Sequence, residues 1–114
     1  MAATVVVVGF CASGKTTLVD ALTERGVDAR AVAQEHSIVR DLWNHSEPDV
    51  VIFLDVDIEH IRERRGNPDW PEWIYELQRE RLAAARERAD LVVDTSALTA
   101  DELVDAVIRH LRLQ

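Results

Sequence analysis

The sequence predicts a single α/β domain built on a small, mainly parallel sheet of about four strands, with helices on both faces. Segments with strand character alternate with segments of helical periodicity along the 114 residues. The runs 4–8 and 50–54 are continuous, apolar and rich in β-branched residues, which is typical of parallel strands buried on both faces. Right-handed crossovers between such strands place helices on both sides of the sheet. The length suits one domain that spans residues 1–114.

Each element has its own signal in the sequence. Strands are predicted at 4–8, 27–34, 50–54 and 91–93, and helices at 15–25, 37–44, 58–65, 72–89 and 100–113. Gly26 is expected to end the first helix, and Ser96 or Thr99 to cap the last one. Two prolines and a glycine in residues 66–71 interrupt the helical pattern. The helix at 37–44 is expected to place four apolar side chains inward, namely Ile38, Val39, Leu42 and Trp43.

Composition narrows the class of function. The formal net charge of −8 argues against a general affinity for nucleic acid or for anionic membranes. The apolar runs are too short to span a bilayer, and the N-terminus does not resemble a signal peptide. A single cysteine, Cys11, excludes an internal disulfide and fits a reducing compartment. We therefore expect a cytoplasmic protein without a nucleic-acid or membrane partner.

Residues 9–16, Gly-Phe-Cys-Ala-Ser-Gly-Lys-Thr, match the phosphate-loop motif G-x-x-x-x-G-K-[ST] in full. The motif lies between a buried strand and an amphipathic helix, and this context argues against a chance glycine turn. Lys15 is expected to reach the β- and γ-phosphates, and the Thr16 hydroxyl to bind Mg²⁺. Lys15 is also the sole lysine among 13 basic residues. The predicted cofactors are ATP, or another NTP, and Mg²⁺. The predicted nucleotide contacts are Gly9, Cys11, Ala12, Ser13, Gly14, Lys15, Thr16 and Thr17.

Three blocks of sequence resemble the small P-loop kinases, the group that includes shikimate kinase, dephospho-coenzyme A kinase and the nucleoside monophosphate kinases. The blocks are VVVVGFCASGKTTLVDAL, VVIFLDVDIEHIRERR and RLAAARERADLVVDTSALTADELVDAVIRHL. The resemblance implies a three-layer P-loop NTPase fold and transfer of the γ-phosphoryl group. It also implies the strand order 27–34, 4–8, 50–54, 91–93. The region between the first helix and residue 50 is shorter than in that group and contains one predicted strand in place of two.

The resemblance also implies roles for individual residues. Arg62, Arg64 and Arg65 fall where such kinases carry the arginines of a closing lid, with Arg62 and Arg65 predicted to be catalytic. Arg81 falls where such kinases carry an arginine near nucleotide and acceptor, and it is also predicted to be catalytic. Thr95 belongs to the loop beside the adenine and is predicted to contact the nucleotide. The alternative for the arginines of 58–65 is a solvated helix face, supported by acidic residues at i,i+4 spacing.

Two carboxylates are candidates for the metal or for general base catalysis. Asp55 ends a buried strand and is predicted either to hold Mg²⁺ or to cap the next helix. Glu35 replaces the aspartate that is expected beside the phosphate loop, and is a candidate metal ligand and base. It belongs to the polar cluster 34–37 at a predicted strand end, where ligands bind in open α/β sheets. The alternative for this cluster is a helix entry capped by Ser37.

Several side chains are given structural roles. Trp70 and Trp73 are expected to pack the lid's hinge against the body, with stacking on a base as the alternative. Arg79, Arg86 and Arg88 are expected on a solvated helix face with neighbouring glutamates.

Three functions stay open at this point. The first is a kinase that transfers a phosphoryl group from ATP to a small-molecule or nucleotide acceptor. The second is a nucleotide-binding module that hydrolyses ATP slowly or not at all. The third is an assembly ATPase completed by a second subunit, such as a homodimer partner.

Overall fold

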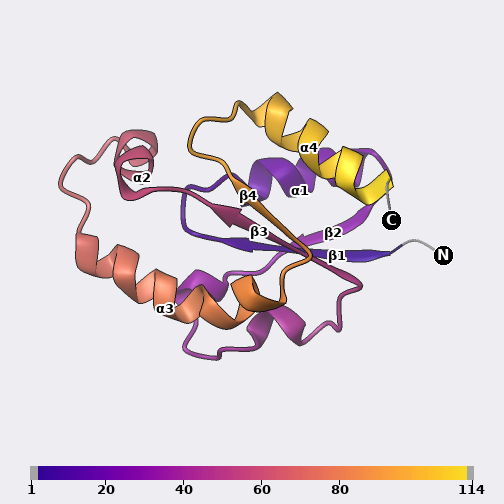
Figure 1. Cartoon of the computed structure of the whole chain (residues 1–114), viewed down its shortest axis with the longest axis horizontal. Helices are drawn as coiled ribbons and strands as arrows, with labels where there is room; N and C mark the ends of the chain where they lie inside the picture. The colour runs from indigo at the N-terminus through magenta and orange to yellow at the C-terminus, as the bar shows by residue number, and fades with distance from the viewer. Residues whose placement is uncertain (1–2, 113–114) are drawn as a thin grey trace.

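Four parallel strands form one sheet in the order β2-β1-β3-β4 (Figure 1). The computed structural model describes residues 3–112. The strands are β1 (Thr4–Gly9), β2 (Asp28–Ala31), β3 (Val50–Asp55) and β4 (Leu91–Asp94). The helices are α1 (Lys15–Glu24), α2 (Ile58–Arg65), α3 (Glu72–Arg88) and α4 (Ala100–Arg112), with 3-10 turns η1 (Gln34–His36) and η2 (Leu42–Asn44). The predicted α/β class and strand order are confirmed.

The two central strands divide the core into two layers. Side chains alternate along β1, so that Val6 and Val8 belong to one apolar cluster and Val5 and Val7 to the other. α1 and α4 cover one face, and α3 with the segment 34–44 covers the other (Figure 1). This two-sided cover explains why the strands read as continuous apolar runs rather than as alternating ones.

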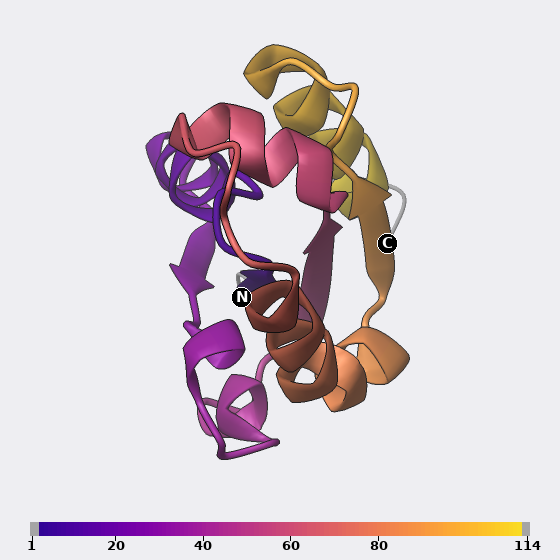
Figure 2. The ribbon, with the colours of Figure 1, turned by 90° about the vertical axis from the view of Figure 1, so that its left-hand side faces the viewer.

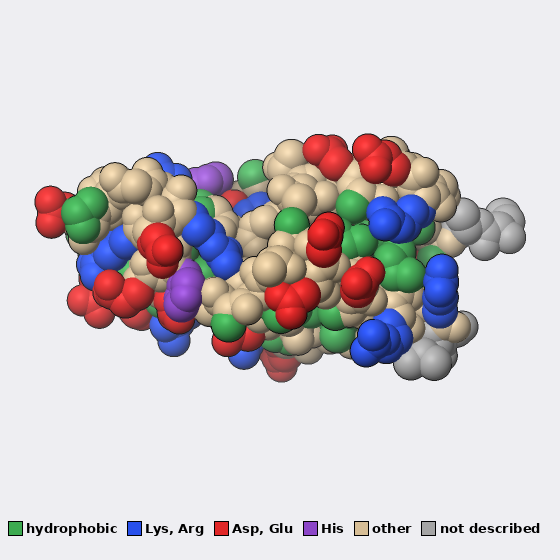
Figure 3. Space-filling model, turned by 90° about the horizontal axis from the view of Figure 1, so that it is seen from above, with side chains coloured by type: hydrophobic (Ala, Val, Ile, Leu, Met, Phe, Trp, Pro, Cys, Tyr) green, Lys and Arg blue, Asp and Glu red, His purple; other side chains and the backbone are tan. Residues whose placement is uncertain are grey.

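The carboxyl ends of the strands form one edge of the sheet, and α2 lies across it (Figure 2). In that view the segment 34–44 lies beside α3, on the side away from α4. Seen from above α4, acidic side chains are spread over the surface, and arginines lie towards both ends (Figure 3). No described helix is long and apolar enough to cross a membrane.

The helix predicted at 37–44 is not formed, and the prediction was wrong. Ile38 is 82% exposed and Val39 is 43% exposed, while Trp43 is buried within the 3-10 turn η2. The cause is Gln34, which is fully buried and forms hydrogen bonds with backbone groups of this segment that a helix would use for its own hydrogen bonds. Its amide accepts from the Trp43 N–H at 3.0 Å and donates to the Val39 carbonyl at 2.6 Å.

Ser37 and the second strand also differ from prediction. The Ser37 hydroxyl accepts from the N–H of Val39 rather than capping a helix. β2 covers 28–31, a shorter stretch than the predicted 27–34. The chain turns into η1 directly afterwards, which places the polar residues 34–36 at the carboxyl edge of the sheet.

Other predicted helix ends are confirmed. Gly26 follows α1 with φ +81°, a left-handed conformation that favours glycine. Thr99 caps α4, because its hydroxyl accepts from the Glu102 N–H while the Glu102 carboxylate accepts from the Thr99 N–H. Ser96 instead accepts from the N–H of Asp57.

Candidate phosphate-binding site

The loop 9–14 connects the central strand β1 to α1 at the carboxyl edge of the sheet. Its first residue, Gly9, has no room for a side chain. A Cβ at this position would lie 2.3 Å from the carbonyl oxygen of Leu54 on β3. The glycine therefore allows the loop to leave the sheet directly against the neighbouring strand.

The backbone of the loop is shaped to present N–H groups. Ala12 has φ +58° and Gly14 has φ +101°, and left-handed residues of this kind curve the chain into a concave turn of the type that binds anions in other proteins. α1 begins at Lys15, and among the described residues no side chain caps it at Gly14. Its first N–H groups, including those of Thr16 and Thr17, have no acceptor within the helix and favour an anion through the helix dipole.

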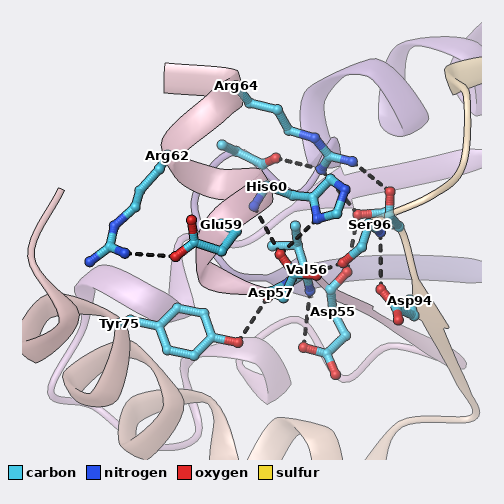
Figure 4. A network of polar contacts seen from close by, with 12 residues as sticks. Asp55, Val56, Asp57, Glu59, His60, Arg62, Arg64, Tyr75, Asp94 and Ser96 are labelled. Carbon is cyan, nitrogen blue, oxygen red and sulfur yellow. Dashed lines mark hydrogen bonds and ion pairs between the residues drawn. The ribbon is translucent and has the colours of Figure 1, made fainter. Parts of the chain in front are cut away.

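α3 holds the loop from behind. Gln78 is a buried polar residue of α3, and its side-chain oxygen accepts from the N–H of Cys11 at 3.1 Å. Phe10 stacks on Tyr75 of the same helix, with ring centroids 4.6 Å apart. The Tyr75 hydroxyl donates to the carbonyl of Val56 (Figure 4), and burial raises the pKa of this hydroxyl. The loop is therefore fixed before any ligand arrives.

Lys15 folds back over the loop. Its ammonium donates to the carbonyls of Gly9 at 3.0 Å and Phe10 at 2.8 Å, and to the Glu35 carboxylate at 2.5 Å. Glu35 is 3% exposed, and its second oxygen, Oε1, has no hydrogen-bond partner among the described residues. The structure thus brings the predicted lysine and the predicted carboxylate together, although they are 20 residues apart in sequence.

The three arginines of α2 take different positions. Arg64 reaches the loop, donating to the Ala12 carbonyl at 2.9 Å and to the carbonyl of Thr95 at 2.5 Å (Figure 4). Arg62 turns away and donates to the Trp70 carbonyl and to Glu59. Arg65 lies over the ring of Trp70. Arg62 and Arg65, the two arginines of α2 that were predicted to be catalytic, are thus engaged with the body of the protein, and Arg64 is the one at the loop.

A cavity of about 200 Å³ opens between Arg64 and the start of α4. Its walls come from the phosphate loop, from α2 and from residues 95–103, and comprise Ala12, Ser13, Gly14, Thr17, Arg64, Thr95, Leu98, Thr99, Ala100 and Leu103. Thr95 is buried, and its hydroxyl donates to the carbonyl of Asp55. Thr95 therefore shapes the wall of the cavity rather than presenting a free hydroxyl to it. The hydroxyl of Ser13 is also buried and has no partner among the described residues.

Asp55 is engaged at both oxygens. One accepts from the N–H of Val56, and the other pairs with Arg86 of α3 at 2.9 Å. Arg86 lies on an exposed face of α3, as expected, and its guanidinium also reaches Asp55 and lies over the Phe53 ring. Asp55 does not cap α2.

Asp57 takes the role of cap on α2. Its carboxylate accepts from the N–H of His60 at 2.8 Å, and this bond lowers the pKa of Asp57. The ring of His60 adds a second contact, and the N–H of Asp57 donates to Ser96 next to β4 (Figure 4). α2 is therefore tied to the end of β4 at its first turn, and to the phosphate loop through Arg64 near its last turn.

Arg81 lies on the far side of Glu35. Its Nη1 is 3.5 Å from the Glu35 carbonyl, and its Nε is buried without a hydrogen-bond partner among the described residues. A second cavity, of about 140 Å³, borders this arginine and is lined by Ile38, Arg40, Leu77, Glu80 and Arg81. One of these two cavities is thus lined by the start of α4 and the other by α3.

The two tryptophans around Pro71 behave differently. Trp70 is buried and carries the contacts with Arg62 and Arg65, as the hinge-packing interpretation predicted. Trp73 is 67% exposed, so that part of the prediction was wrong. The connection between α2 and α3 is therefore anchored through one ring.

The donor set suits a magnesium ion bound together with phosphate. Among residues 3–112 no group of three His, Cys, Asp or Glu side chains forms an all-protein metal site. Mg²⁺ is usually held by one or two protein oxygens together with phosphate oxygens and water. Thr16 is exposed at the start of α1, and Glu35 has a free carboxylate oxygen beside Lys15. These two residues fit such an ion.

Comparison with known proteins adds no assignment. No protein-family model matches the chain, and no curated protein matches it in sequence. Sequence reasoning placed Gln34 only within the polar cluster 34–37 and did not name Gln78; both are buried and bonded to the backbone of the site segments. The signal for Gln78 is a polar residue at a core position of a helix; Gln34 has no periodic signal because it lies outside regular structure.

Proposed function

We propose that this chain binds a nucleoside triphosphate, ATP with Mg²⁺, through residues 9–17 and transfers its γ-phosphoryl group to a small acceptor. The observation that carries the proposal is the loop itself. A rigid backbone nest at the start of an uncapped helix is covered by the side chain of the only lysine in the sequence. A polyanion is the ligand that satisfies both the N–H groups and the ammonium.

The surroundings favour a nucleotide over a simple phosphate ion. The cavity of about 200 Å³ adjoins the loop on the α4 side and has room for a base beside the guanidinium of Arg64. Its apolar walls, which include Leu98 and Leu103, are suited to the faces of an aromatic ring. The triphosphate then runs from this cavity along the loop towards Lys15.

The acceptor is expected on the opposite side of the lysine. Glu35 and Arg81 lie there, next to the cavity of about 140 Å³. An acceptor oxygen attacks the γ-phosphorus while the bond from that phosphorus to the β,γ-bridging oxygen breaks, and ADP leaves. The acceptor's proton passes to a carboxylate, for which Glu35 is the nearest candidate to Lys15.

One observation favours a second candidate, a nucleotide-binding module with slow hydrolysis. Arg62 and Arg65 are engaged with Trp70, and Asp55 with Arg86. Catalysis of phosphoryl transfer depends on positive groups around the transferring phosphoryl group, and here these groups are reduced to Lys15, Arg64 and Arg81. Incubation with ATP, Mg²⁺ and pooled metabolites separates the two candidates. A phosphorylated metabolite supports the kinase, and ADP released without such a product supports the module.

Lys15→Ala tests the binding step that both candidates share. The change removes the ammonium over the loop, and we expect nucleotide affinity to fall by at least a hundredfold in a calorimetric titration with Mg-ATP. Arg30→Ala is a matched control, because Arg30 is an exposed cation of β2 that pairs with Asp28. Equal affinity of Lys15→Ala and wild type would overturn the proposed function.

A further inference from the structure

The ammonium of Lys15 is fully engaged in this structure. A lysine has three N–H donors, and those of Lys15 meet three acceptors, the carbonyls of Gly9 and Phe10 and the carboxylate of Glu35. A phosphate that approaches the loop therefore has to take a donor from one of them. The carboxylate is the acceptor that competes with phosphate for charge as well as for a hydrogen bond.

The carboxylate of Glu35 has few partners other than Lys15. Its side chain is 4% exposed, and its other contact of this kind among the described residues is with the exposed imidazole ring of His36, 3.9 Å away. Arg81 contacts the backbone carbonyl of Glu35 rather than its carboxylate. A buried carboxylate that loses its cation is costly, because neither water nor another charge replaces the lost partner. The binding of phosphate at Lys15 therefore carries the penalty of uncovering Glu35.

We infer that Glu35 makes a divalent cation a condition of tight nucleotide binding. This inference rests on the proposed function and concerns the same loop. Without the cation, triphosphate and Glu35 are two anions that compete for one ammonium, and affinity is low. With the cation, the carboxylate oxygen that has no partner gains one, and Lys15 is released to the phosphates.

Neither Asp55 nor Thr16 can replace Glu35 as the charged ligand of the cation. Asp55 ends the adjacent strand, but its two oxygens are engaged by Val56 and Arg86. Thr16 is exposed at the first turn of α1 and supplies a neutral oxygen, which cannot offset the charge of a cation. The cation dependence of binding should therefore follow the charge at position 35.

Glu35→Gln tests the inference, because the inference predicts a gain in affinity for metal-free ATP, which a purely structural role of Glu35 would not give. We expect this variant to bind ATP in EDTA at least tenfold more tightly than wild type does in EDTA. We also expect the gain in affinity on adding Mg²⁺ to shrink by a similar factor. Calorimetric titration with ATP, in EDTA and in excess Mg²⁺, measures both quantities. Glu76→Gln is the control, since it removes the same charge from an exposed position on α3 and should follow wild type.

Each outcome assigns the result to one hypothesis. If wild type binds Mg-ATP and Glu35→Gln binds metal-free ATP no more tightly than wild type does, this inference is wrong and the proposed function stands. If no protein binds ATP in either buffer, the proposed function fails and this inference fails with it. Glu35→Ala, checked for folding by circular dichroism, serves if the glutamine variant is unfolded, and the same gain is expected.

Discussion

At the scale of single residues, Gly9 connects the fold to the site most directly. It is the last residue of the central strand and the first of the loop, and it lies against the backbone of Leu54. A Cβ added at Gly14 would meet only a side-chain carbon of Leu103 at 3.5 Å, but at Gly9 the neighbour is a carbonyl oxygen of the sheet. The requirement for glycine therefore comes from packing between two strands as well as from the proposed binding of phosphate.

Gly9→Ala should destabilise the protein as a whole. The added Cβ would meet a carbonyl oxygen at 2.3 Å, so β1 and β3 would have to move apart. We expect a loss of about 3 kcal/mol or more in the free energy of unfolding, measured by urea denaturation. Gly66→Ala is the control: it also has positive φ but meets nothing within 4 Å, so its cost is limited to about 1–2 kcal/mol. Equal losses in the two variants would contradict the argument.

The role of a residue was predictable from the sequence where a motif determines it. It was not predictable where tertiary hydrogen bonds determine it. The spacing of Gly9, Gly14 and Lys15 predicts the loop, because each letter has a local mechanical reason. Glu35 was found because it follows a strand at the carboxyl edge. Which arginine of α2 faces the loop depends on the direction of the helix axis, and adjacent residues on a helix differ by about 100°. Position in sequence alone could not choose Arg64 over Arg65.

At the scale of elements, α2 is a brace, because it is tied to other elements near both of its ends. Its first turn is capped by Asp57 and tied to Ser96, and Arg64 joins it to the phosphate loop and to Thr95. The loop after it is anchored by Trp70. An element held at both ends orders the cavity beside it in advance, which lowers the entropic cost of binding.

Arg64→Ala tests this brace. It removes the bonds to Ala12 and Thr95 and one wall of the cavity, so we expect nucleotide affinity to fall by about tenfold. Arg65→Ala removes a contact with Trp70 on the same helix and should change affinity less than twofold. Titration of both variants with Mg-ATP compares them directly. The reverse order would show that Arg65 leaves Trp70 and acts as the lid arginine.

Elements with strong apolar patterns were predictable from the sequence. The segment 37–44 is an exception, because it has an apolar pattern but forms no helix. Ile38, Val39, Leu42 and Trp43 have helical spacing, yet the first two are exposed. The periodicity was outweighed by Gln34, whose amide bonds two backbone groups of the segment. Such a tertiary hydrogen bond leaves no periodic trace in the sequence.

At the scale of the whole molecule, the charge and the caps act together. The chain carries a net charge of −8, and three of its carboxylates stabilise turns or helix starts through backbone N–H groups. These hydrogen bonds lower the pKa of Asp57, Asp94 and Glu102. A carboxylate with a lowered folded pKa stabilises the fold above its unfolded pKa, and this contribution disappears as the pH falls through the folded value.

Acid should therefore destabilise the protein. We expect the free energy of unfolding to fall as the pH drops from about 5 to about 3, because the unfolded chain takes up protons first. Asp57→Asn keeps an N-cap acceptor but removes one titrating group, so its loss over this range should be smaller than that of wild type. Urea denaturation at a series of pH values measures both. Equal slopes for the two proteins would contradict the assignment to Asp57.

The sole lysine and the sole cysteine of this chain belong to the same loop, four residues apart. Apart from the amino terminus, the protein therefore has one primary amine, and the side chain that carries it is 12% exposed and hydrogen-bonded. Acetylation of the chain at a side-chain amine can then occur at a single atom. It would neutralise the ammonium over the loop, so that one acyl group would switch the proposed activity off. The arginines of the chain would keep their charge.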